Sequence, residues 1–192
     1  MAHDSDLATD LQRYLQQSRE SLLGTLDGLS EYDVRRPLTP SGTNLLGLIK
    51  HLTGLEAGYL GECVGRPVPG VPPWDEDESI WQNGDMWAKV DESRDTLIRA
   101  YRTTWVHADA VINELPLSTP AEVEWWPEDR RRTTLGHLLV RMVAETAQHA
   151  GHADILREGI DGRTGSGHDQ MGDKAWWTSY VAGIQEAAEA YR

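Results

Sequence analysis

The sequence has a single cysteine, Cys63, among 192 residues. One cysteine excludes a disulfide within the chain and any metal site built from several thiolates. Phenylalanine is absent while tryptophan occurs 8 times and tyrosine 6 times, so every aromatic side chain carries a polar group. No stretch approaches the roughly 18 apolar residues that a membrane span needs. The first residues also lack the basic and apolar regions of a signal peptide, and we expect a cytoplasmic protein without a membrane partner.

Positive charge is scarce as well. Lys and Arg number 18 against 31 Asp and Glu, which gives a formal net charge of −13. Such a surface does not attract the phosphates of nucleic acids or anionic lipids, so we expect no nucleic-acid partner. The length suits one hydrophobic core. We therefore expect residues 1–192 to form a single domain.

Apolar residues recur at spacings of three and four along most of the chain, which predicts helices and almost no strands. Proline-rich segments without a sustained period separate them. The predicted helices span residues 6–29, 45–65, 90–115, 134–158 and 173–190. Four long helices, a long crossover between the second and the third, and a further helix at the C-terminus predict a four-helix bundle.

The fourth predicted helix carries ionisable side chains on its apolar seam. Steps of three and four from Leu138 pass through Met142, Glu145, His149, His152 and Leu156. A buried carboxylate costs several kcal/mol unless it is hydrogen-bonded, paired with a cation or bound to a metal. Glu145 and His149 are at i and i+4, about 5–6 Å apart at Cβ, so they can share one cation.

A third candidate ligand, His51, is predicted on the inward face of the second helix. Facing helices of a bundle build metal sites in this way. Two imidazoles and one carboxylate leave a coordination position open, which is typical of catalytic zinc. The spacing permits either His51, Glu145 and His149, or His51, His149 and His152 with Glu145 as a nearby base. We favour the first set because a carboxylate on the metal compensates its own burial.

Without a metal, His51 would simply pack in the core, and Glu145 would pair with Arg141 or Lys50. Cys63 is expected on the same helix as His51, about 18 Å further along its axis, as a packed or partly exposed thiol. No phosphate-binding loop, dinucleotide fingerprint or nucleophile elbow is present in the sequence.

Three segments resemble DinB-like proteins of the mini-circle-protein type. The run ETAQHAGHADILRE at 145–158, followed by IDGRTG at 160–165, resembles the signature of that family. The segment RPLTPSGTNLLGLIKHL at 36–52 resembles the entry into its second helix. Trp176 and Trp177 at the start of the last predicted helix also fit, so the resemblance covers essentially the whole chain.

The resemblance implies an all-α, DinB-like bundle with an up-down-down-up order of helices. It also implies a divalent metal, usually zinc or nickel, with zinc favoured. One residue of the second helix and two residues of a later helix would hold this metal. Most members use three histidines. The His, Glu, His ligands of mycothiol-dependent maleylpyruvate isomerase carry over to His51, Glu145 and His149. Relatives act as S-transferases that use low-molecular-weight thiols such as mycothiol or bacillithiol.

These implications favour a metal-dependent transferase or isomerase that activates a mycothiol-like thiol as a thiolate, because a metal lowers the pKa of a bound acid. His152 or Arg141 is expected to orient the substrate, with Trp residues of the irregular segments as pocket walls. The expected partners are the thiol and a small electrophile, with a second copy of the chain as candidate protein partner. Two alternatives stay open: a non-catalytic metal-binding bundle of a stress-response type, and a hydrolase that uses metal-activated water.

Overall fold

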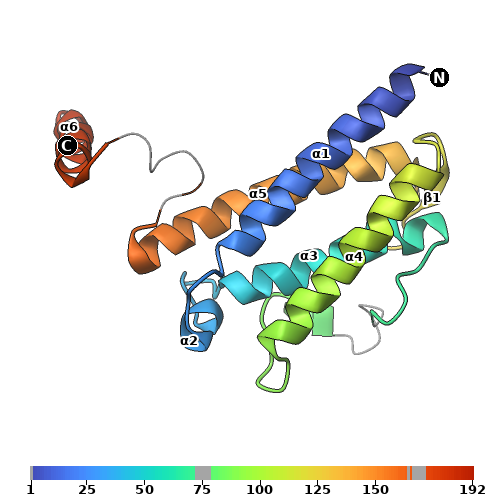
Figure 1. The fold of residues 1–192 in the computed structure, drawn as a ribbon, viewed down its shortest axis with the longest axis horizontal. Coiled ribbons are helices and arrows are strands. Elements are labelled where there is room, and N and C mark those ends of the chain that lie inside the picture. Colours follow the sequence, from blue (N-terminus) through green and yellow to red (C-terminus); the bar gives the residue numbers. More distant parts are fainter. Residues whose placement is uncertain (1, 72–78, 164, 166–171) are drawn as a thin grey trace.

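The computed structural model describes residues 2–71, 79–163, 165 and 172–192. Four long helices form a bundle: α1 (Ala2–Gly24), α3 (Leu45–Leu60), α4 (Arg94–Glu114) and α5 (Leu135–Asp161). Helices α1 and α5 run in one direction and α3 and α4 in the other (Figure 1), which is the predicted up-down-down-up order. Helix α1 packs mainly on α5, and α3 packs on both α4 and α5. The expected all-α bundle is confirmed.

The long crossover follows from the parallel direction of α3 and α4. A 16-residue α3 is about 24 Å long, and the chain must travel back over that length before α4 begins. The described part of the crossover contains the short 3₁₀ helices η1 (Glu62–Val64) and η2 (Ser79–Gln82). Ser93 ends it by capping α4, because its side chain accepts a hydrogen bond from the backbone N–H of Thr96.

Several predicted helix boundaries are wrong, and one of them is the start of the third helix, which begins at Arg94 rather than near residue 90. The first helix ends at Gly24 rather than near residue 29, and a separate short helix, α2 (Glu31–Arg35), follows after a series of turns. The apolar spacing predicted too long a first helix, because Leu26, in those turns, is also buried and continues the apolar pattern. Cys63 lies in η1 rather than on the helix of His51, since α3 ends at Leu60.

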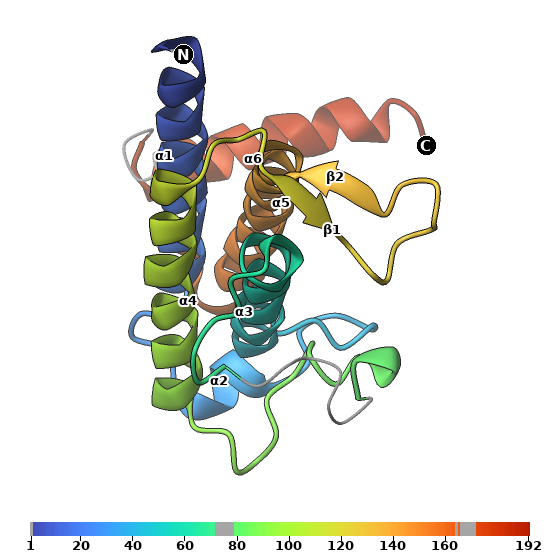
Figure 2. The ribbon, with the colours of Figure 1, turned by 90° about the vertical axis from the view of Figure 1, so that its right-hand side faces the viewer.

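A small hairpin was not predicted. Strands β1 (Pro120–Glu122) and β2 (Arg132–Thr134) pair in antiparallel fashion, with Ala121 opposite Thr133. Figure 2 shows the hairpin next to the beginning of α5. Strands of three residues are too short for an alternating pattern to reveal them. The sequence offers Thr133 or Thr134 as the cap of α5, and Thr134 is the cap, because its side chain accepts a hydrogen bond from the backbone N–H of His137.

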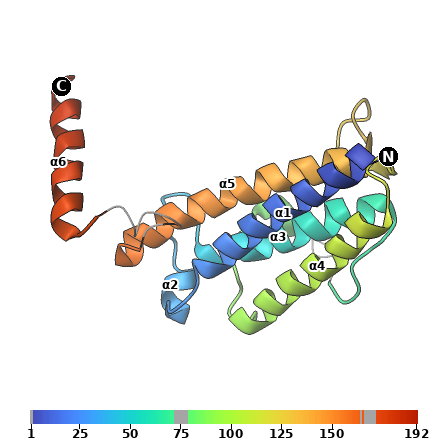
Figure 3. The same ribbon diagram turned by 45° about the horizontal axis from the view of Figure 1, so that its top comes forward.

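The core lies between the four long helices, where leucines of α1, α3 and α5 meet Tyr101 and Ala108 of α4. The predicted C-terminal helix, α6 (Lys174–Glu189), lies apart from this bundle (Figure 3), and none of its residues is buried. Within the described part of the chain, no helix combines the length and the apolar character that a membrane crossing requires.

Candidate metal centre

Helices α3 and α5 bring His51, Glu145 and His149 together. One possible ligand atom from each of the three lies within 4.8 Å of the other two. Glu145 Oε1 is 3.3 Å from His149 Nε2 and 3.8 Å from His51 Nε2. The two imidazole rings meet edge to face with their centroids 5.0 Å apart. All three residues are half-buried, so the cluster lies between core and solvent.

The donor chemistry of this cluster fits a divalent cation. Imidazole nitrogen and carboxylate oxygen are ligands that zinc and nickel accept, provided that the imidazoles are neutral. Burial lowers the pKa of His149, and the neighbouring His51 lowers it further, so this imidazole is neutral near pH 7. Its Nδ1 is buried and has no hydrogen-bond partner within the described residues. The protein alone therefore leaves this imidazole incompletely satisfied.

Asp85 contacts the imidazole of His51 at Nδ1 and orients the ring. Its Oδ2 lies 2.6 Å from His51 Nδ1, and the residue is only 8% exposed. An ionised carboxylate can only accept hydrogen bonds, so Nδ1 is the donor to Asp85 and Nε2 is the nitrogen that faces Glu145. A carboxylate in this position is the usual outer partner of a metal-ligating histidine. The sequence does not predict this role for Asp85, which lies in an irregular segment.

The segment that carries Asp85 is fastened to α3 by backbone contacts. Lys50 Nζ donates to the Gly84 carbonyl at 2.9 Å, and Asn44 Nδ2 donates to the Met86 carbonyl at 3.1 Å. Gly47 allows this close approach, since a Cβ there would stand 1.9 Å from the Met86 carbonyl oxygen. Asp85 is therefore held rigidly against the helix of His51.

If no metal were bound, a neighbouring cation would have to compensate the charge of Glu145. Lys50 forms an ion pair with Glu92 at 2.8 Å rather than with Glu145. Arg141 lies closer, with Nη2 4.0 Å from Glu145 Oε2, at the limit of an ion pair. One distant guanidinium compensates a half-buried carboxylate only weakly.

Arg141 is held by aromatic rings. Its guanidinium lies over the rings of Tyr59, at 5.0 Å, and Trp126, at 5.6 Å. The indole N–H groups of Trp125 and Trp126 donate to the Tyr59 hydroxyl at 3.3 and 3.2 Å. The Nε of Arg141 is buried without a partner among the described residues. Trp126 of the second irregular segment thus lies against Arg141, and Trp125 supports Tyr59, whereas Trp74 of the first irregular segment lies outside the described residues.

His152 and Cys63 lie outside the three-residue cluster. His152 is exposed on the next turn of α5, with its ring centroid 5.4 Å from that of His149. Cys63 is buried, and burial, with smaller contributions from Glu62 and Glu124, raises its pKa to about 12. A thiol with this pKa is not a nucleophile at neutral pH.

The up-down-down-up bundle with a His, Glu, His cluster between its second and last long helices is the arrangement that the resemblance to DinB-like proteins implies. Residues 10–162 match the family model described as mycothiol-S-transferase, which covers the bundle and ends before α6. The chain belongs to the mycothiol-S-transferase family. This confirms the predicted relation to DinB-like proteins. No curated protein matches the chain.

Proposed function

We propose that this protein is a metal-dependent S-transferase that joins mycothiol to a small electrophile. The observation that carries the proposal is the convergence of His51, Glu145 and His149 in a chain of the mycothiol-S-transferase family. The protein itself offers no cysteine that could act as the nucleophile, since the thiol of Cys63 is buried. The reactive sulfur must therefore belong to the cosubstrate.

His51, Glu145 and His149 would hold the metal. When bound, a divalent cation supplies positive charge that favours the thiolate over the thiol at neutral pH. Asp85 supports this by fixing the ring of His51, and Glu145 would add a carboxylate oxygen to the two imidazole nitrogens.

The remaining steps fall to side chains around the cluster. His152, exposed beside His149, is the candidate acceptor for the thiol proton. The sulfur lone pair then forms the C–S bond with the electrophilic carbon, and the leaving group departs with the electrons of its own bond. Arg141, positioned by Tyr59 and Trp126, is suited to orient an electronegative group of the electrophile.

The test is a transfer assay with purified protein, mycothiol and chlorobimane, before and after removal of metal by a chelator. We expect conjugate formation that is lost with the metal and returns on addition of zinc or nickel. Metal binding without transfer to any electrophile tested would favour a non-catalytic bundle. Hydrolysis of esters or amides in the absence of mycothiol would favour the metal-activated-water alternative.

A further inference from the structure

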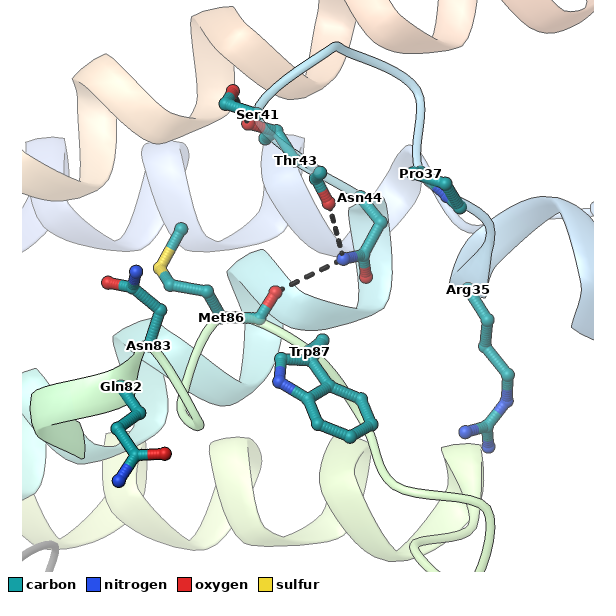
Figure 4. A pocket seen from close by; sticks show the side chains of 10 residues that line it. Arg35, Pro37, Ser41, Thr43, Asn44, Gln82, Asn83, Met86 and Trp87 are labelled. Atoms are coloured by element: carbon teal, nitrogen blue, oxygen red, sulfur yellow. Dashed lines mark hydrogen bonds between the residues drawn. The ribbon is translucent and has the colours of Figure 1, made fainter. Parts of the chain in front are cut away.

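A pocket of about 510 Å³ lies at the N-terminal end of α3. It opens between the loop that leads from α2 into α3 and the segment that follows η2 (Figure 4). Its polar and aromatic lining comprises Ser41, Thr43, Asn44, Gln82, Asn83 and Trp87. Nothing in the proposed chemistry uses these residues.

The lining suits a neutral molecule that carries many hydroxyl groups. Hydroxyl and carboxamide side chains can both donate and accept hydrogen bonds. The side-chain carboxamides of Gln82 and Asn83 have no hydrogen-bond partner in the described part of the chain, and both residues are exposed. Trp87 is 50% exposed and offers an indole face on which the C–H groups of a sugar ring can stack.

The same lining is poorly suited to an anion. Arg35 is the one charged residue among the described residues of the lining. Its three guanidinium nitrogens are already engaged: Nε donates to Glu31, and the other two donate to the carbonyls of Lys89 and Glu92. A carboxylate in the pocket would therefore lose water without gaining a free cation.

The pocket lies within reach of the candidate metal centre. Asn44 is the N-cap of α3, and His51 lies seven residues further along the chain, about 10 Å away along the helix axis. Met86, which lines the pocket, directly follows Asp85, which holds His51. A separation of about 10 Å is within the length of one extended ligand.

We propose that this pocket binds the sugar and cyclitol end of the thiol cosubstrate while its sulfur reaches His51, Glu145 and His149. The inference rests on the proposed function, because mycothiol joins a cysteine-derived thiol to a neutral, polyhydroxylated glucosamine–inositol unit. It also predicts selectivity: thiols such as glutathione, whose far end carries carboxylates, lack a partner in this pocket.

The test compares two pocket variants with a neighbouring control. Asn83 has a φ of 56°, a conformation that glycine adopts without strain, so Asn83→Gly removes the amide and keeps the fold. Trp87→Ala removes the stacking face. Trp81→Ala is the matched control, because Trp81 is 76% exposed on the same segment and does not line the pocket.

We expect each pocket variant to raise KM for mycothiol about tenfold, as loss of one good contact does. The preference for mycothiol over N-acetylcysteine, which lacks the sugar, should fall by a similar factor. Trp81→Ala should match the wild type in both measurements, and all variants should retain bound zinc. An unchanged KM in both pocket variants would overturn the inference.

A second measurement separates this inference from the transferase proposal. S-methyl mycothiol cannot react, so calorimetry reports its binding whether or not the protein catalyses transfer. Binding that weakens about tenfold in Asn83→Gly and Trp87→Ala supports the pocket even if no transfer is found. Absence of binding to the wild type, or equal binding to all variants, would refute it.

Discussion

Removal of the Asp85 carboxylate should weaken metal binding although Asp85 is not a predicted ligand. The residue is 8% exposed and its Oδ2 lies 2.6 Å from His51 Nδ1, so the contact is short and shielded from water. Loss of such an outer partner typically costs 10–100-fold in metal affinity, or about 1.4–2.7 kcal/mol. Asp85→Asn keeps an oxygen that can accept the Nδ1 proton, so we expect the lower end, about tenfold. Asp85→Ala frees the ring to rotate, and we expect about 100-fold.

The assay is zinc affinity measured by competition with a chromophoric chelator. Glu92→Gln is the control, because Glu92 binds Lys50 beside His51 but does not touch the imidazole. It should retain zinc affinity within about threefold, as expected for a partly exposed ion pair. If Asp85→Ala bound zinc as tightly as the wild type while His51→Ala did not, the orienting role of Asp85 would be refuted.

Two further predictions concern buried groups away from the cluster. Cys63→Ser should keep both metal content and thiol transfer, because burial holds the pKa of Cys63 at about 12; loss of transfer with metal retained would indicate a covalent cysteine mechanism instead. Arg19→Met should lower the free energy of unfolding by about 3–5 kcal/mol at pH 8, because it leaves the fully buried Glu56 without its cationic partner. Burial already raises the pKa of Glu56 to about 7, and a raised carboxyl pKa contributes stability at low pH that is lost as pH rises. Urea unfolding should therefore show a smaller cost at pH 5 than at pH 8, and an equal cost at both would contradict this explanation.

Local sequence signals predicted most of the bundle. Helix caps are local interactions, so the polar run 41–44 and the pair Thr133 and Thr134 indicated where α3 and α5 begin, and Asn44 and Thr134 are the caps. The helical period likewise placed Glu145 and His149 on one face, since both belong to the same helix. His51 could be added because its helix showed the same inward stripe. Contacts between residues four apart on one helix can therefore be predicted from the sequence.

The parts that could not be predicted depend on contacts between distant segments. Asp85 reaches His51 across 34 residues from an irregular segment that has no period. Several other acidic residues lie in that segment, and spacing cannot select among them. The position of Asp85 is instead set by Lys50, Asn44 and Gly47, which fasten the backbone around it to α3. The contacts of Arg141 with Tyr59 and Trp126 are of the same long-range kind.

The most direct test of the central claim, that His51, Glu145 and His149 hold a divalent metal, is the zinc content of three proteins after reloading and dialysis. The wild type should retain about one zinc per chain. His152→Ala should retain the same amount, because His152 lies outside the three-residue cluster. Glu145→Ala should lose most of its zinc, because it lacks one of the three donors. Zinc kept in Glu145→Ala and lost in His152→Ala would contradict the account, make His152 a ligand and leave Glu145 as a general base.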